Sequence, residues 1–146
     1  MIRDILFRGK RKDNSEWIQG FYAIQSNHAC FQSELKYTSF ILKDEFMDWG
    51  LGGLAEYEVI PETVGQFTGL TDKNGKKIFE GDIVEFTNKF THQKGRAEIV
   101  FEAFKWKYSG CYYGGNPIVW LCIDDNSIEY EVIGNIYDNP ELLEEV

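Results

Sequence analysis

The sequence predicts a mainly β protein of the α+β class with little helix, and three observations lead to that prediction. Turn-forming residues are frequent and the apolar runs between them are short, which is typical of strands. Only the last residues carry the signals of a helix start. Aromatic residues make up 16% of the 146 residues, and burying one Phe-sized side chain is worth about 1.5–3 kcal/mol. We therefore expect the aromatic side chains to build the core.

The first half of the chain contains the signals of a β-hairpin and of further strands. We expect residues 2–7 and 17–24 to form the two strands of the hairpin, joined by a charged turn at residues 12–15. One or two more strands are expected around residues 30–31 and 37–42.

A second hairpin is the clearest local signal in the chain. We expect strands over residues 64–70 and 78–86, the latter with a bend or bulge at Gly81. Between them, Asn74 and Gly75 tolerate the positive φ that both central residues of a type I′ turn adopt, so we expect that turn here.

The remaining strands are expected over residues 97–104, 118–123 and 128–137, the last interrupted at Gly134. The run 118–123 is continuously apolar, which predicts a central strand. Residues 109–117 are rich in glycine and are expected to form a loop.

A short helix is expected at the C-terminal end. Asn139 is a good N-cap residue, Pro140 fits the first helical position, and Glu141 lies at the positive end of the helix dipole. A helix this short is not stable alone, so we expect it to pack on the sheet.

Two subdomains that share one core are the expected domain organisation. Residues 1–56 would form an N-terminal β-hairpin subdomain, and residues 57–146 a strongly bent sheet or small barrel with the terminal helix. The Gly-rich stretch 48–53 is expected to be a flexible connection before the boundary.

The charge of the chain is unevenly distributed. The net charge is −9, and no Lys or Arg follows Lys107. A chain this acidic is a poor first candidate for binding a polyanion, because phosphate contacts need Lys and Arg. The acidic end also suggests a DNA mimic that blocks an enzyme acting on DNA, although its carboxylates are sparse for that role. These eight carboxylates are Asp124, Asp125, Glu129, Glu131, Asp138, Glu141, Glu144 and Glu145.

Cysteine usage and hydropathy predict a cytoplasmic protein. The three cysteines, Cys30, Cys111 and Cys122, show no C-x-x-C spacing and are expected to be reduced thiols. The residues after Met1 form no apolar signal region, and no apolar run approaches the ~20 residues of a membrane span. We expect no membrane association.

No group of residues predicts a reaction, a metal site or a cofactor. His28 and Cys30 are two ligand types without the further ligands that zinc needs. Asp124 and Asp125 lie in an expected turn, where Asp is favoured for its own backbone hydrogen bonds. Asp82 is the most interesting carboxylate, and here too we favour a side chain that bonds turn amides. We expect a protein that is not an enzyme, with no catalytic residue, no metal and no cofactor.

The best candidates for recognition are basic residues interleaved with aromatic ones. Such a pattern holds single-stranded nucleic acid by charge and stacking, or contacts a protein partner. The alternative is a half-buried strand whose aromatic side chains enter the core while the lysines face solvent. The residues are Lys105, Trp106, Lys107, Tyr108, Tyr112 and Tyr113.

A second candidate is a basic patch near the N-terminus, formed by Arg8, Lys10, Arg11 and Lys12. Here the alternative is a solvated turn without a binding role.

Several blocks of the sequence resemble the YopX-type phage proteins. They begin at Ile5-Leu6-Phe7-Arg8-Gly9-Lys10-Arg11, with Trp17 and Gly20 after them, and continue in Pro61-Glu62-Thr63-Val64-Gly65-Gln66-Phe67-Thr68-Gly69-Leu70, Asp72-Lys73-Asn74-Gly75-Lys76, Glu80-Gly81-Asp82-Ile83-Val84 and Glu131-Val132-Ile133-Gly134-Asn135-Ile136-Tyr137-Asp138-Asn139-Pro140-Glu141-Leu142. The resemblance implies an origin in phages and prophages of Gram-positive bacteria, and a mainly β fold with a C-terminal SH3-like barrel. It implies no catalytic residue.

The expected function is therefore that of a non-enzymatic interaction protein of a phage or prophage, with a protein partner or a second copy of itself. The first alternative is a nucleic-acid-binding accessory protein of phage replication or expression, and the second is the DNA mimic.

Overall fold

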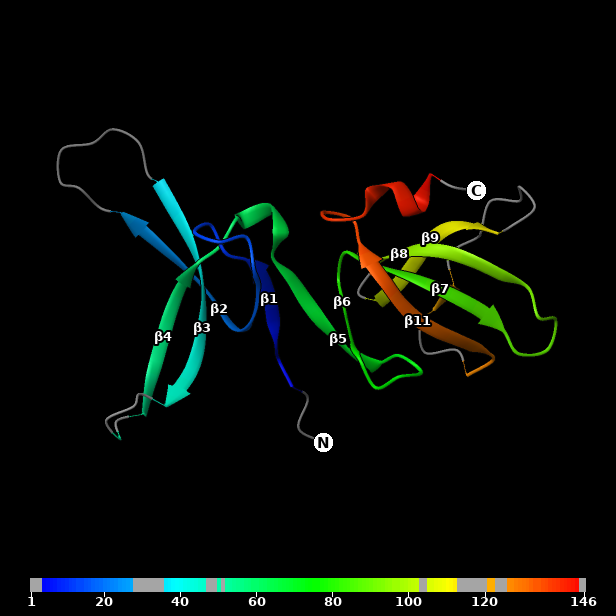
Figure 1. Ribbon diagram of the computed structural model, residues 1–146, viewed down its shortest axis with the longest axis horizontal. Helices are drawn as coiled ribbons and strands as arrows, with labels where there is room; N and C mark the ends of the chain where they lie inside the picture. The colour runs from blue at the N-terminus through cyan, green and yellow to red at the C-terminus, as the bar shows by residue number, and fades with distance from the viewer. Residues whose placement is uncertain are drawn as a thin grey trace. The chain divides into compact units, whose positions relative to one another are not determined.

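The structure is a computed structural model, and the part of the chain that it describes is β-rich. Eleven strands and two short 3-10 helices lie in this part (Figure 1). The prediction of a mainly β fold with little helix is confirmed. The described residues are 4–27, 36–46, 50, 52–102, 105–112, 121–122 and 126–144, with the backbone alone at 27, 46, 102, 105–112 and 121–122.

The chain divides into two compact units, residues 1–66 (unit 1) and 67–146 (unit 2). The division lies later than the predicted boundary between residues 56 and 57. That boundary falls inside strand β4 (Gly52–Glu58), whose pairing with β3 (Lys36–Phe46) keeps it within unit 1. Strand β5 (Gly65–Thr71) begins in unit 1 and continues in unit 2.

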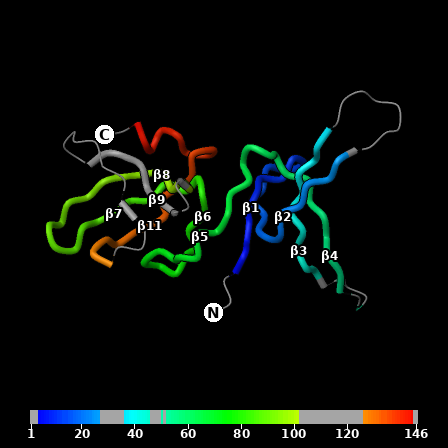
Figure 2. Tube along the Cα trace, turned by 180° about the vertical axis from the view of Figure 1, so that it is seen from behind, coloured from blue at the N-terminus to red at the C-terminus, as the bar shows by residue number. Residues whose placement is uncertain are grey.

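The strands of unit 1 form an antiparallel sheet in the order β4-β3-β2-β1-β5. Besides β3, β4 and the start of β5, the sheet contains β1 (Phe7–Lys10) and β2 (Trp17–Asn27), and the 3-10 helix η1 (Pro61–Thr63) precedes β5. Figure 2 shows β2, β3 and β4 side by side from the opposite direction to Figure 1.

Strand β1 begins at Phe7, where the predicted strand 2–7 ends. The basic residues that follow belong to the strand because they pack on other parts of unit 1. Arg8 is buried, and its guanidinium lies 4.7 Å from the centre of the Trp17 ring. Gly9 lies so close to Val59 that an added Cβ would be 3.0 Å from the Val59 Cβ. Tertiary contacts therefore extend the strand into a region that is polar in sequence.

Strand β2 changes its partner at Gly20. Its first four residues pair with β1, from Trp17 opposite Lys10 onward, and the rest pair with β3, beginning with Phe21 opposite Leu42. At this point the backbones approach closely, and a Cβ added to Gly20 would lie 2.1 Å from the Leu42 carbonyl oxygen. No side chain fits there without movement of the backbone.

Unit 1 has its own small core. It lies on the face of the sheet that carries alternate residues of β2, β3 and β4, as the period-two geometry of strands requires. Its buried members are Ile18, Ile41 and Val59, with Phe7, Tyr22, Tyr57 and Val64 packed against them.

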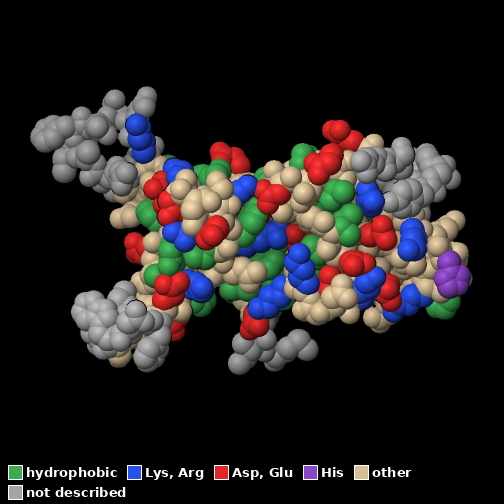
Figure 3. Space-filling model, viewed as in Figure 1, with side chains coloured by type: hydrophobic (Ala, Val, Ile, Leu, Met, Phe, Trp, Pro, Cys, Tyr) green, Lys and Arg blue, Asp and Glu red, His purple; other side chains and the backbone are tan. Residues whose placement is uncertain are grey.

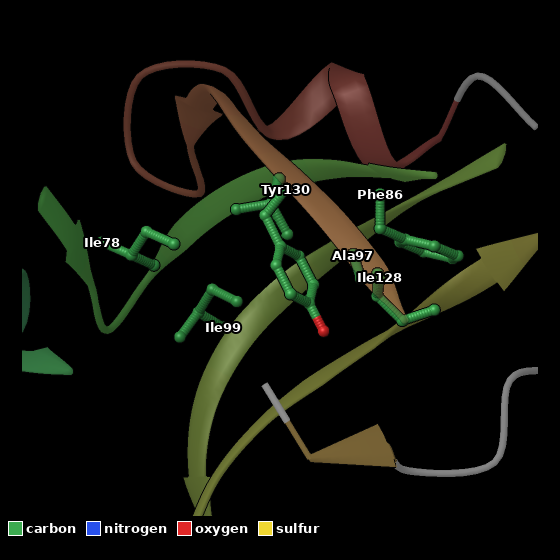
Figure 4. Close-up of a cluster of buried hydrophobic side chains, with 7 residues drawn as sticks. Ile78, Phe86, Ala97, Ile99, Ile128 and Tyr130 are labelled. Atoms are coloured by element: carbon green, nitrogen blue, oxygen red, sulfur yellow. The ribbon is translucent and has the colours of Figure 1, made fainter. Parts of the chain in front are cut away.

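Unit 2 contains a second antiparallel sheet, in the order β10-β9-β8-β7-β11. The strands of unit 2 are β6 (Lys77–Phe79), which pairs with β5, and β7 (Asp82–Asn88), β8 (Lys94–Glu102), β9 (Lys105–Tyr112), β10 (Leu121–Cys122) and β11 (Ile128–Asn135). Figure 4 shows side chains of β6, β7, β8 and β11 converging on one core. Its buried members are Ile78, Val84, Phe86, Ala97, Ile99, Ile128 and Tyr130.

The expected small barrel is not closed in the described residues, and one prediction about this sheet requires correction. In the described residues β10 and β11 lie at opposite ends of the sheet and do not pair, so hydrogen bonds do not close a barrel there. The apolar run 118–123 was expected to form a central strand. Its two described residues, Leu121 and Cys122, form β10, which within the described part of the chain ends the sheet and pairs with β9. An apolar run reports burial, and it does not report position within a sheet.

The hairpin turn between β5 and β6 differs from the predicted type I′ turn. Among its residues only Gly75 has a positive φ, at 80°, and Asn74 does not. The Gly75 N–H donates to the Asp72 carbonyl, and the Asp72 N–H to the Lys76 carbonyl. This is the pattern of a type I turn followed by a left-handed glycine. The Asp72 carboxylate favours it by accepting hydrogen bonds from the N–H groups of Asn74 and Lys76.

The end of the chain confirms one prediction and corrects another. Strand β11 has a register irregularity between Val132 and Gly134, as the interruption at Gly134 predicted. The terminal helix is the 3-10 helix η2 (Pro140–Leu143), and the Asn139 side chain makes no capping hydrogen bond. Asn139 instead packs against Gly134, where an added Cβ would lie 2.6 Å from its Oδ1.

Candidate functional site

Asp82, the carboxylate singled out in the sequence, and His92 lie apart on unit 2. Asp82 is 1% exposed at the start of β7, and its Oδ2 accepts a hydrogen bond of 2.8 Å from the Phe79 N–H. This agrees with the structural role expected for it. His92 is exposed in the turn after the other end of β7, with a φ of 57°. The two side chains therefore form no common site.

A carboxyl group of β8 has a perturbed pKa. Burial raises the pKa of Glu98, and the neighbouring Glu80 carboxylate raises it further. Neither residue lines the pocket described next. Among the described residues, no three His, Cys, Asp or Glu side chains are grouped so that they could hold a metal ion. The pair His28 and Cys30 lies outside the described residues.

An open pocket of about 160 Å³ lies beside β7, β8 and β11 in unit 2. Charged side chains that line the pocket form ion pairs with one another. Lys73 Nζ lies 2.5 Å from Glu131 Oε2, and Lys94 Nζ lies 3.8 Å from Glu85 Oε1. The pairing of Lys73 with Glu131 raises the pKa of Lys73. Glu129, Thr87 and Tyr130 complete the lining. The pocket thus resembles a surface network of paired charges, which contributes little free energy to the fold.

The residues proposed for recognition, 105–108 and 112, lie on strand β9, and Tyr113 lies outside the described residues. Residues 109–112 were expected to begin a Gly-rich loop, but they pair with β8 as part of β9. In this register Lys105 is opposite Glu102, and Tyr108 is opposite Ile99, which is fully buried. The side chains of β9 are not described, so their binding role stays a prediction.

The predicted basic patch, Arg8, Lys10, Arg11 and Lys12, is largely neutralised within unit 1. Arg11 donates two hydrogen bonds to the Asp13 carboxylate, which lower the pKa of Asp13. Lys12 Nζ lies 2.6 Å from Glu58 Oε1. Arg8 is buried against Trp17. On the side drawn in Figure 3, Lys and Arg side chains lie among Asp and Glu side chains and form no continuous positively charged patch.

One surface of unit 1 with exposed apolar side chains is the face of β2, β3 and β4 that points away from the unit 1 core. Register fixes its composition: Phe21 is opposite Leu42, and Ala23 is opposite Phe40. With Leu54 of β4, these five residues are called the outer face below.

The outer face remains open to solvent. Phe21 is 58% exposed and Leu54 59% exposed, while Ala23, Phe40 and Leu42 are half-buried. Large apolar side chains grouped on one surface mark interaction sites more often than scattered ones do. This face was not predicted from the sequence, although large apolar residues occupy both odd and even positions of β2 and β3. That pattern is typical of strands covered on both faces.

Acidic residues border the outer face. Asp44 is opposite Leu54, and Glu56 is opposite Leu42. Both are exposed, and neither takes part in an ion pair among the described residues. Glu58, on the same face of β4, is paired with Lys12. The electrostatic field at the border of the outer face is therefore negative.

The fold and the outer face together define a mainly β protein of two units with an exposed apolar sheet surface. The chain matches the YopX protein family over residues 6–144, and it belongs to this family. The resemblance seen in the sequence is thereby confirmed.

Among solved structures, the crystal structure of protein EF1440 from Enterococcus faecalis is similar to this chain. The two share 25% sequence identity over 97% of this chain and 99% of the other, with a TM-score of 0.50. The search of curated proteins finds no match. No helix within the described residues has the length and apolar character needed to cross a membrane.

Proposed function

We propose that this protein is a non-enzymatic interaction protein of a phage or prophage, and that it binds a partner protein in the bacterial cytoplasm through the outer face. The observation that carries the proposal is that Phe21 and Leu54 are exposed on the same face of the sheet as Phe40 and Leu42. Aromatic anchors that become buried at an interface supply much of the binding free energy.

The charges beside the outer face indicate the chemistry of the partner. The carboxylates of Asp44 and Glu56, which form no ion pair among the described residues, favour an apolar surface bordered by Lys and Arg. Such complementarity mainly raises the association rate, and salt weakens it.

Replacing Phe21 with threonine is expected to weaken partner binding at least about tenfold, because burying a Phe side chain is worth about 1.5–3 kcal/mol. Thr suits a strand, so the fold is expected to persist. Proteins captured from host lysate would be purified, and their direct binding to the unchanged chain and to Phe21→Thr would be measured by calorimetry.

Phe90→Thr is the matched control, because Phe90 is 81% exposed in the β7–β8 turn of unit 2. It is expected to bind as the unchanged chain does. Asp44→Lys is expected to slow association at low salt. Equal affinity of Phe21→Thr and the unchanged chain would contradict the proposal. So would a shift of DNA or RNA at about 50 mM salt that is lost on replacing Lys105 and Lys107.

A further inference from the structure

Strand β4 is an edge strand of the unit 1 sheet. It is the first strand in the order β4-β3-β2-β1, and within the described residues it pairs along its length with β3 alone. An edge strand presents backbone N–H and C=O groups that can pair with another strand.

The ladder between β3 and β4 shows which backbone groups point outward. The Val59 N–H donates to the Ser39 carbonyl over 3.0 Å, so these residues form a hydrogen-bonded pair. Because such pairs alternate along an antiparallel ladder, residues 53, 55 and 57 also face β3, and the even residues of β4 face outward. The Glu58 carbonyl confirms that the even residues of β4 face outward, because it accepts a hydrogen bond from the N–H of Lys12, a residue outside β3.

Three outward residues remain: Gly52, Leu54 and Glu56. No backbone hydrogen bond within the described part of the chain reaches their outward groups. The strand contains no Pro or Lys and its register with β3 is regular, so several of the features that usually prevent edge pairing are absent. Its charged residues are Glu56 and Glu58. Three consecutive outward residues are therefore ready to receive a second strand.

We propose that two copies of this chain associate through β4, antiparallel and centred on Leu54. This rests on the proposed function and names a second copy as an additional partner. A two-fold axis at Leu54 places Leu54 opposite Leu54 of the second copy, and Gly52 opposite Glu56. Every outward group of the three residues is then paired.

Other symmetric registers are less favourable. Centring the pairing on Glu56 would place two like charges directly opposite each other. Centring it on Ala55 would require the Glu58 carbonyl, which already accepts a hydrogen bond from Lys12. Centring it on Leu54 avoids both problems and brings two exposed apolar side chains together.

The association also extends the outer face. Leu54 belongs to that face, so the outer faces of the two copies meet at the axis and form one apolar surface for the partner. A contact of this length buries little area, and small interfaces are weak. The association is therefore expected to depend on concentration in the micromolar range.

Sedimentation of the full chain over a wide concentration range tests the association. The average mass is expected to rise from 17.0 kDa toward twice that value. Leu54→Lys places two like charges at the axis and is expected to weaken the association at least about tenfold. A thermal unfolding curve shows whether this variant is folded. A mass that stays at 17.0 kDa at every concentration would overturn the inference.

Oxidative cross-linking tests the register separately. Leu54→Cys is expected to form a disulfide between copies, because paired Cα atoms about 5.5 Å apart are within disulfide reach. Glu56→Cys is expected not to cross-link, because it faces Gly52. The unchanged chain controls for the three native cysteines. Equal cross-linking of the two variants would overturn the register.

The two proposals fail in different ways. The Phe21→Thr chain is expected to associate as the unchanged chain does, because Phe21 lies on β2, away from the edge. If the unchanged chain did not self-associate but still bound its partner through Phe21, only the inference about β4 would be overturned. Self-association without any effect of Phe21→Thr on partner binding would overturn only the proposed function.

Discussion

Replacing Gly20 with alanine is expected to lower the free energy of unfolding of unit 1 by about 3 kcal/mol. The added Cβ would lie 2.1 Å from the Leu42 carbonyl oxygen and 3.0 Å from Ile41 Cγ2. The oxygen belongs to the backbone, so the clash is relieved only if β2 and β3 separate where β2 changes its partner. Urea unfolding followed by circular dichroism measures the effect.

Gly53→Ala is the matched control for this substitution. Gly53 lies on β4 in the same unit, and nothing lies within 4 Å of the Cβ that would be added there. Alanine at this position is expected to leave stability unchanged or raise it by about 0.5 kcal/mol, because it restricts the unfolded chain. If Gly20→Ala and Gly53→Ala unfolded at the same urea concentration, the close approach of β2 and β3 would be wrong.

The close approach at Gly20 also shows what the sequence could not reveal. In the sequence, Gly20 was noted only as part of the family resemblance. A glycine within an apolar strand pattern does not indicate which atoms lie against it in the folded chain. The approaching oxygen comes from Leu42 on another strand. A requirement for glycine that arises from a tertiary contact becomes visible only in the folded structure.

Strands were predicted correctly where the residues of the strand and of its turns carry the signal by themselves. The strand expected over residues 64–70 is β5 (Gly65–Thr71), and the interruption at Gly134 is a true irregularity of β11. By contrast, residues 109–112 were expected to lie in a loop because of their glycine content. They form part of β9 because Gly110 pairs with Ala97 of β8, and pairing of this kind overrides local propensity.

The expectation that the aromatic side chains build the core is only partly correct. Phe79 and Phe86 are fully buried, whereas Phe21, Phe90 and Phe101 are at least half exposed. Composition alone does not distinguish the two groups, because hydrophobicity is the same in both. Register distinguishes them for Phe21, which lies on the opposite face from its neighbour Tyr22, and that is why the outer face was not predicted.

Replacing Asp72 with alanine is expected to lower the free energy of unfolding of unit 2 by about 3 kcal/mol, because hydrogen bonds to a charged group contribute about 1.5–3 kcal/mol each. Asp72 is 7% exposed. Its Oδ1 accepts from the N–H groups of Asn74 and Lys76, and its Oδ2 accepts from the Val132 N–H over 3.0 Å. One side chain thus orders the β5–β6 turn and joins it to β11.

The same carboxylate makes stability depend on pH. Burial is the largest influence on the pKa of Asp72 and raises it, but the hydrogen bonds from Val132, Lys76 and Asn74 together outweigh burial and leave the pKa below its usual value. Because the folded-state pKa is depressed, the contribution is fully present above the unfolded pKa of about 3.9 and is lost as the pH falls through the folded value. Urea unfolding at a series of pH values below about 5 measures this loss.

Asp72→Asn separates the charge from the geometry. Asparagine can keep the Oδ1 acceptor of the turn, but its amide nitrogen replaces the acceptor of the Val132 N–H. Asp72→Asn is expected to be less stable than the unchanged chain and more stable than Asp72→Ala. Its stability is expected to depend less on acid pH than that of the unchanged chain. If both variants kept the full acid dependence of the unchanged chain, the depressed pKa would have to belong to another carboxylate. If Asp72→Ala were as stable as the unchanged chain at neutral pH, the link between the turn and β11 would contribute nothing to the fold.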